Sequence, residues 1–420
     1  MGPKDGWLNR SGDLNGKRQQ YIVWLLWLLV LGAIPVVAHF EQPAWDLDVY
    51  RHAMQSVRVG HDPYADSTAV QEAALAANGV PSPYGPFNYD YSPITLPALK
   101  FFAWLPLVGA GLLYGLLYAG GVWAQNRFGV SLMTAAERRV LMYFVPISIF
   151  FPGLLGSDNV ISGNVAYILY GAVLLALGRA LRTGRWEWFY AAVLATSCFK
   201  PPMLCLLALP VLCGRRQWLP ALGAGTAGLG LFAVQPMLFP HLFANYLKAV
   251  RLIFSYNRDF GFSPAGLYSG RLFDHHAAYS PAGQMFYLAY ALPILGALLY
   301  LSARYKRGDF TLQEWLPVAL CGVVLLNPRL IEYDVAPLAL PLMLICWRAF
   351  RADHGVRGTL LCVLAVFIPL NLVATHTWTL WKLTEGPLLV TFLLAGMATL
   401  LKSAQTVDAI DVVPALLAEG

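Results

Sequence analysis

Long apolar runs recur along the whole chain, from Tyr21 near its start to Lys402 near its end, and short polar segments separate them. Most of these runs are long enough to cross the ~30 Å hydrocarbon core of a bilayer as an α-helix. They lack the strict alternation of apolar and polar positions that membrane β-strands show. The pattern therefore predicts an all-α, polytopic integral membrane protein with about 10–12 transmembrane helices.

Basic residues fall in short clusters between the runs, and such clusters are typical of cytoplasmic loops. Lys17 and Arg18 precede the first run, which is too long for a signal-peptide core and is expected to remain as a span. Short amphipathic helices are predicted at 46–59 and 67–78. The predicted boundaries are a cytoplasmic N-terminal tail at 1–20, one transmembrane domain at 21–403 and a cytoplasmic C-terminal tail at 404–420, with large external segments at 41–92 and 240–282.

The stretch between Arg185 and Arg215 differs from the other runs, because two apolar pieces too short to span meet at Lys200 and Pro201. Both outer ends of this stretch are basic, so both are expected on the same side of the membrane. We therefore predict a pair of short helices that enter the membrane and return, with Lys200 at the turn. Broken helices at this depth are tolerated only where protein or a cavity surrounds them.

Composition and charge exclude several classes of function. The chain has 420 residues, of which 58% are hydrophobic and 12% charged, about half the charged fraction of a soluble protein. The net charge of +6 comes from the clusters between spans, so nucleic acid is not an expected partner. The six cysteines lie in or beside apolar runs without CxxC spacing, which predicts neither a zinc site nor a disulfide framework. We expect no metal and no other cofactor.

The predicted topology places several polar clusters on the external side, where we expect the functional site. The first cluster follows the first span, a Gly/Pro/Tyr-rich run follows it, and further clusters follow later spans. The candidate residues are Asp46, Asp48, Tyr50, Arg51, Tyr64, Tyr91, Asp158, Asn159, Asn164, Lys200, Arg258, His275, His276, Arg329, Glu332, Tyr333 and Asp334.

Asp46 is the first candidate for catalysis. The interfacial aromatics Trp45 and Tyr50 flank it and should hold it at headgroup depth. A partly desolvated carboxylate there has a raised pKa and is suited to act as a general base. Asp48 is the second candidate, although positions two apart on a helix diverge, and a solvated helix cap explains it equally well.

Lys200 and Arg329 are the candidate cations for a phosphate group. A lysine in an apolar stretch is costly unless it pairs or reaches the interface, so snorkelling is the alternative for Lys200. Arg329 departs from the positive-inside pattern, and an ion pair with Glu332 or Asp334 is its alternative. His275 and His276 are adjacent on a loop and point in different directions, so they do not predict a metal site.

The order of these motifs resembles glycosyltransferase family 87, in the glycosyltransferase-C superfamily of enzymes that use polyprenyl-phosphate sugars. Mannosyltransferases of actinobacteria are its best-known members. Each motif is weak alone, and their order along roughly 20–350 carries the likeness. The motifs are DLxVY at Asp46–Tyr50, GxxPY at Gly60–Tyr64, Tyr–Ser–Pro at Tyr91–Pro93, the loop at Gly156–Asn159, Lys200–Pro201, and NPRxxEYD at Asn327–Asp334.

The resemblance implies an inverting transfer from a polyprenyl-phosphate sugar to a lipid-linked glycan or another acceptor. It implies that Asp46, or else Asp48, is the catalytic base, and that the product is a glycolipid of the cell envelope. The implied location is the bacterial cytoplasmic (inner) membrane, with the active site facing the periplasm or exterior. The mannosyltransferases tend to carry histidine after tryptophan where this chain has Ile331–Asp334, so the donor sugar stays open.

Two other classes use similar membrane scaffolds. A transporter or lipid flippase predicts paired charges in mid-span and repeat symmetry, and neither is visible in the sequence. A polysaccharide polymerase or ligase takes a pyrophosphate-linked donor and predicts several external arginines, which are few here. The glycosyltransferase is therefore the favoured hypothesis.

Overall fold

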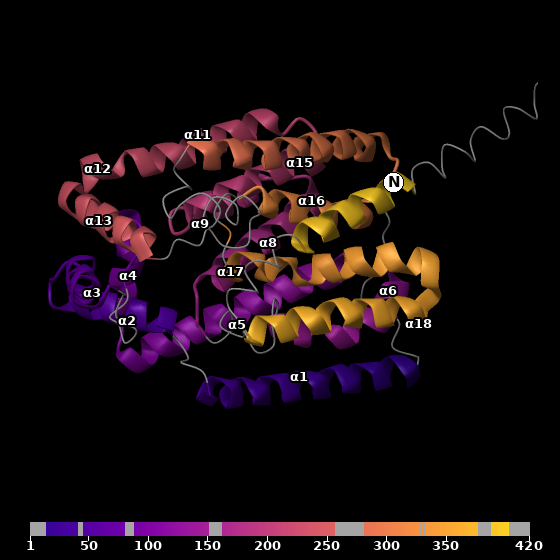
Figure 1. Cartoon of the computed structure of the whole chain (residues 1–420), viewed down its shortest axis with the longest axis horizontal. Helices are drawn as coiled ribbons and strands as arrows, with labels where there is room; N and C mark the ends of the chain where they lie inside the picture. Colours follow the sequence, from indigo (N-terminus) through magenta and orange to yellow (C-terminus); the bar gives the residue numbers. More distant parts are fainter. Residues whose placement is uncertain are drawn as a thin grey trace, which may run out of the picture.

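The chain is a bundle of α-helices whose long members run side by side (Figure 1). The computed structural model describes residues 14–40, 45–79, 88–150, 162–256, 281–327, 330, 332–376 and 388–402. Five helical segments in these ranges are long and apolar enough to cross a membrane, so the predicted all-α, polytopic membrane class is confirmed. The five are Leu107–Ser131 (α5), Ala166–Thr183 (α8), Trp218–Leu238 (α11 and α12), Gly283–Arg307 in α15, and Tyr333–Phe350, which covers most of α17 (Glu332–Val335), a 3₁₀ turn and the first part of α18.

Close packing of α5 against α8 forms one side of the core. Gly121 on α5 and Gly171 on α8 lie at the crossing, where a Cβ on Gly121 would stand 2.4 Å from the Tyr167 carbonyl oxygen. Small residues allow such backbone contact between helices in a membrane. The central helix is α16 (Leu312–Leu325), whose side chains from Trp315 to Leu325 are all buried. An apolar helix buried all round is typical of a core position.

Apolar side chains also cover the outside of the bundle. Helix α1 (Leu14–Phe40) lies at its edge, and Leu25 and Leu28 on this helix are more than half exposed. Leu112 and Leu116 on α5 are 66% and 72% exposed. A soluble protein would hide such side chains, whereas lipid solvates them. The exposed surface therefore agrees with a bundle that lipid surrounds.

Short helices gather at one end of the bundle, called here the α2 end (Figure 1, left). Lys248 on one of these helices forms an ion pair with Glu72 at 2.9 Å, and Asn245 donates to Asp62 at 2.6 Å. The predicted amphipathic helices at 46–59 and 67–78 are present as α2 and α3, whereas the helix α13 inside the predicted segment 240–282 was not anticipated. These helices are α2 (Trp45–Arg58), α3 (Ala65–Asn78), α4 (Leu96–Trp104) and α13 (Pro240–Tyr256).

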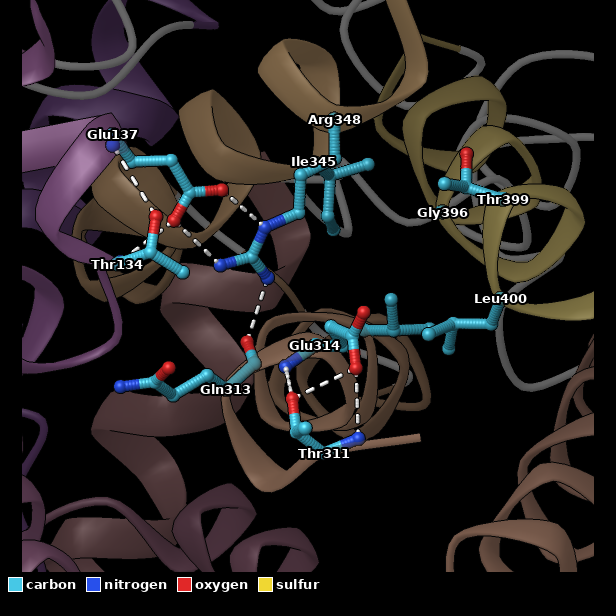
Figure 2. Close-up of a pocket in the computed structure, with 11 residues that line it drawn as sticks. Thr134, Glu137, Thr311, Gln313, Glu314, Ile345, Arg348, Gly396, Thr399 and Leu400 are labelled. Atoms are coloured by element: carbon cyan, nitrogen blue, oxygen red, sulfur yellow. Dashed lines mark hydrogen bonds and ion pairs between the residues drawn. The ribbon is translucent and has the colours of Figure 1, made fainter. Parts of the chain in front are cut away.

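Basic residues collect at the opposite end, called here the basic end, where Arg348 joins three helices (Figure 2). Its Nε and Nη2 donate to the Glu137 carboxylate at 2.7 and 3.0 Å, and its Nη1 donates to the Gln313 carbonyl at 2.6 Å. A pocket of about 330 Å³ adjoins this contact. The guanidinium is engaged with the protein, so we interpret it as a structural clamp between α6 (Ala135–Leu141), α16 and α18 (Ala339–His376).

The predicted pair of short helices around Lys200 is confirmed. The Tyr190 hydroxyl donates to Gln217 Oε1 at 3.0 Å, so the two outer ends of this pair lie together, and at the basic end the Ser302 hydroxyl donates to the Leu212 carbonyl at 2.7 Å. Its turn lies at the α2 end, where the Ser92 hydroxyl donates to the Cys198 carbonyl at 2.9 Å. Lys200 is therefore carried to the α2 end by a re-entrant hairpin. The hairpin consists of α9 (Glu187–Ser197), the 3₁₀ helix η4 (Pro201–Leu207) and α10 (Ala208–Cys213).

One segment differs from the continuous span that the apolar pattern predicts. The apolar run at 139–155, which its length and hydropathy predict to be one span, is interrupted within its described part, because α6 gives way to short 3₁₀ turns on either side of Pro146. Proline lacks a backbone N–H and clashes with the preceding turn, so it ends a helix. The short apolar segment 93–106, for which the sequence left open an interfacial helix or the beginning of the next span, is separate from α5, since Pro106 stands in an extended conformation between α4 and α5.

Candidate functional site

The first turn of α2 is fixed by the turn at Ser162–Asn164. The Leu47 amide donates to the Ser162 carbonyl at 3.3 Å, and the Tyr114 hydroxyl donates to the Gly163 carbonyl at 2.6 Å. Gly163 has φ +69°, and a Cβ there would stand 2.5 Å from Leu47 Cγ. Only glycine fits both the backbone and the space. This contact sets the position of Asp46, which lies one residue before Leu47.

Asp46 points its carboxylate into this packed region. The residue is partly buried, and its Oδ2 is inaccessible and has no hydrogen-bond partner among the described residues. Burial raises the pKa of the Asp46 carboxyl from 3.8 to about 6, although hydrogen bonding from Asn164 and the charge of Lys200 act to lower it. Asp90 raises the pKa, and Ser162 lowers it by hydrogen bonding. A carboxylate with this pKa and a free oxygen is suited to accept a proton.

Three of the predicted tyrosines form the framework beside Asp46. The hydroxyls of Tyr50 and Tyr91 lie 2.8 Å apart, and the Tyr64 hydroxyl donates to the Tyr91 carbonyl at 2.8 Å. The Val165 amide donates to the Tyr50 hydroxyl at 3.1 Å. Burial raises the pKa of Tyr50 and Tyr91 well above the usual value, so both stay neutral. These tyrosines position α2 against the bundle, and their hydroxyls are used within the protein.

Lys200 meets Asp334 in the interior. The two groups lie 3.3 Å apart, and their side chains are only 13% and 7% exposed. The Tyr170 hydroxyl lies 3.5 Å from the same Asp334 oxygen, and the Lys200 ammonium stands 5.3 Å from the centre of the Tyr333 ring. Lys200 therefore does not snorkel, and its charge acts on Asp46 as well. The structure brings Asp46, Lys200, Tyr333 and Asp334 into one polar region.

Asp48 and Arg51 lie elsewhere on α2. They form an ion pair with each other at 3.1 Å, and each side chain is about half exposed. The geometry therefore separates the two aspartates, as their spacing on a helix predicts. Among the other candidates, Asn164 lies beside Asp46, and its Oδ1 accepts from the Ala166 amide at 2.9 Å.

Several candidates lie outside the described residues, so their positions stay predictions. These are Asp158, Asn159, Arg258, His275, His276 and Arg329, together with the side chain of Glu332.

Four residues of this region were not among the candidates predicted from the sequence: Asp90, Tyr114, Ser162 and Tyr170. Ser162 lies between the candidates Asn159 and Asn164, so its neighbourhood was a usable signal. Tyr114 and Tyr170 lie within apolar spans, where nothing in the pattern marks them.

Comparisons with known proteins and a search for metal ligands add no assignment. No protein-family model, curated protein or solved structure matches this chain. The resemblance to glycosyltransferase family 87 therefore rests on the order of the sequence motifs. Within the described ranges, no group of three or more His, Cys, Asp or Glu residues is placed to hold a metal ion.

Proposed function

We propose that this protein is an inverting glycosyltransferase that takes its sugar from a polyprenyl phosphate. The observation that carries the proposal is Asp46, whose inaccessible Oδ2 lacks a partner among the described residues while its pKa lies near 6. A structural carboxylate is normally paired or solvated, so an unsatisfied one is a candidate for catalysis. The nearby cation Lys200 provides the second group that the reaction needs.

The reaction is a single displacement at C1 of the donor sugar. The acceptor hydroxyl gives its proton to the Asp46 carboxylate, and its oxygen attacks C1. The bond between C1 and the phosphate oxygen breaks, and its electron pair leaves with the polyprenyl phosphate. Lys200 neutralises the charge that develops on this phosphate, which is worth more in a site with little water. Asp334 and Tyr333 position the Lys200 ammonium.

The arrangement of charge supports an outward-facing site. Arg304, Lys306 and Arg307 end α15 at the basic end, and Arg348 lies there too. Such an excess of basic residues is typical of the cytoplasmic side, so the α2 end with Asp46 would face the periplasm or exterior of a bacterial cytoplasmic membrane. Activated sugars on that side are carried by lipids, which agrees with a polyprenyl-phosphate donor and a lipid-linked or glycan acceptor.

A transfer assay tests the proposal. The purified protein in lipid nanodiscs is incubated with radiolabelled polyprenyl-phosphate mannose, glucose or arabinose and with a lipid extract of the source membrane. We expect one donor to label a lipid product, with loss of labelling in Asp46→Asn and retention in the matched control Asp48→Asn. Full activity of Asp46→Asn would remove Asp46 as the base. Labelling by none of the donors would instead favour a transporter or a polymerase with a pyrophosphate-linked donor.

A further inference from the structure

A second, smaller pocket lies between α2 and α3, separate from the polar region around Asp46. Its volume is about 130 Å³, which suits a small ring-sized ligand. Three residues of its floor, Val49, Ala53 and Tyr89, are buried. The lining residues are Val49, His52, Ala53, Gln55, Ser56, Pro63, Asp66, Ser67 and Tyr89.

The chemistry of the lining favours a neutral ligand rich in hydroxyl groups. An imidazole, an amide and two hydroxyls line the pocket and together offer both donors and acceptors. The described residues of the lining include no lysine or arginine, so they offer a phosphate group no counter-charge. Its one carboxylate, Asp66, lies 3.6 Å from His61 and 3.5 Å from the Ser56 hydroxyl. A buried aromatic side chain beneath polar groups suits the apolar face of a sugar ring.

Hydrogen-bonding capacity around this pocket is unused. Within the described ranges, the side chains of His52 and Gln55 have no hydrogen-bond partner. Both amide atoms of Asn88, the residue before Tyr89, are inaccessible and without a partner there. The hydroxyl of Thr68, the residue after Ser67, is also inaccessible and without a partner among the described residues. Asn88 and Thr68 are not part of the lining, whereas His52 and Gln55 are, so the unused donors and acceptors of these two side chains are available to a polar ligand.

The pocket lies at a distance from Asp46 that neighbouring sugar units of one glycan could bridge, because α2 carries Asp46 and also lines the pocket. Asp46 lies in the first turn of α2 and His52 six positions later, which corresponds to ~9 Å along the axis at ~1.5 Å per residue. We propose that this pocket binds a sugar unit of the acceptor glycan, next to the unit whose hydroxyl Asp46 deprotonates. This inference rests on the proposed function and adds that the acceptor is an oligosaccharide rather than a lipid with a single sugar.

A substitution at the rim tests the inference with little risk to folding. Gln55 is exposed, and Gln55→Trp places a large side chain over the pocket. Val59, which is 68% exposed and outside the lining, provides the matched control Val59→Trp. The measurement is the initial rate of label transfer in nanodiscs, with the donor and the lipid extract each varied in turn.

We expect Gln55→Trp to raise the amount of extract that gives half-maximal rate at least tenfold, with the half-saturating donor concentration unchanged. Val59→Trp should match the unchanged protein in its dependence on the extract and in its dependence on the donor. Equal acceptor dependence in the two variants would overturn the inference, and so would a change of donor dependence alone. The unchanged protein is the control for the proposed function. If it transfers no label, the proposed function and this inference are both overturned. If it transfers label, the comparison of the two variants tests this inference alone.

Discussion

The ammonium of Lys200 lies 3.3 Å from the carboxylate of Asp334, although 134 residues separate them in the chain. The contact joins the turn of the re-entrant hairpin to the helical segment that leads into α18. A buried pair of this kind is not strong evidence of stability, because desolvation offsets much of the attraction. The charge of Lys200 also acts on Asp46, which agrees with the proposed role of this lysine in holding the donor phosphate.

Removing one partner of this pair should be costly. Asp334→Ala leaves the Lys200 ammonium buried without its partner, and we expect a loss of about 3–5 kcal/mol in unfolding free energy. Lys200→Met with Asp334→Leu removes both charges, and its stability should lie near that of the unchanged protein. Denaturant titration in detergent micelles measures both. The double variant should still lose transfer, since the phosphate then has no Lys200; full transfer would show that this lysine is not needed.

The pH dependence of transfer should follow Asp46. The base must be ionised, and burial raises the pKa of Asp46 to about 6. The rate at low substrate should therefore be constant above about pH 7 and fall about tenfold per unit below pH 6. Rates measured between pH 5 and pH 8.5, with return of samples to pH 7.5 as the control for denaturation, check this. A constant rate down to pH 5 would contradict the assignment.

Asp46→Asn should be inactive and more stable than the unchanged protein at pH 8. An acid with a raised pKa in the folded state destabilises that state when it is ionised, so this cost is present above pH 6 and vanishes below pH 4. The shift from 3.8 to about 6 corresponds to at most about 3 kcal/mol. Melting temperatures at pH 8 and pH 5 test this, and the advantage of Asp46→Asn should shrink at pH 5. Lower stability at pH 8 would mean that the carboxylate is paired.

Gly163→Ala should impair transfer by moving Asp46. Its methyl group would overlap Leu47, and the backbone at φ +69° disfavours any side chain. We expect a rate reduction of at least tenfold with the protein still folded. Gly184→Ala, which also has a positive φ but no neighbour within 4 Å, is the control for backbone strain. Similar effects of the two variants on transfer would show that the contact with Leu47 does not matter.

The sequence predicted the class of fold and the re-entrant hairpin, because length of apolar runs and placement of basic residues determine both. It failed where a proline interrupts an apolar run, as at Pro146, since hydropathy alone does not distinguish a span from helical fragments. It also missed α13, whose mixed composition resembles a loop until its apolar face packs against the α2 end.

The candidate site was predictable in part. Lys200 is unusual for its apolar surroundings, and Asp46 stands between Trp45 and Tyr50 just past the first apolar run, so the sequence marks both residues. The partner of Lys200 was not predictable, because Asp334 is equally suited to pair with Arg329, and only the fold brings it to the hairpin. Tyr114 is ordinary for a membrane helix, so its bond to Gly163 required the structure.

The hairpin also determines how deep the Lys200 ammonium lies. Both legs start at the basic end, so the length of α9, eleven residues or about 16 Å, sets the height of the turn. A one-residue deletion in α9 would lower the ammonium by ~1.5 Å and rotate it by ~100°. The number of residues in one short helix therefore sets the distance between this charge and the opposite end of the bundle.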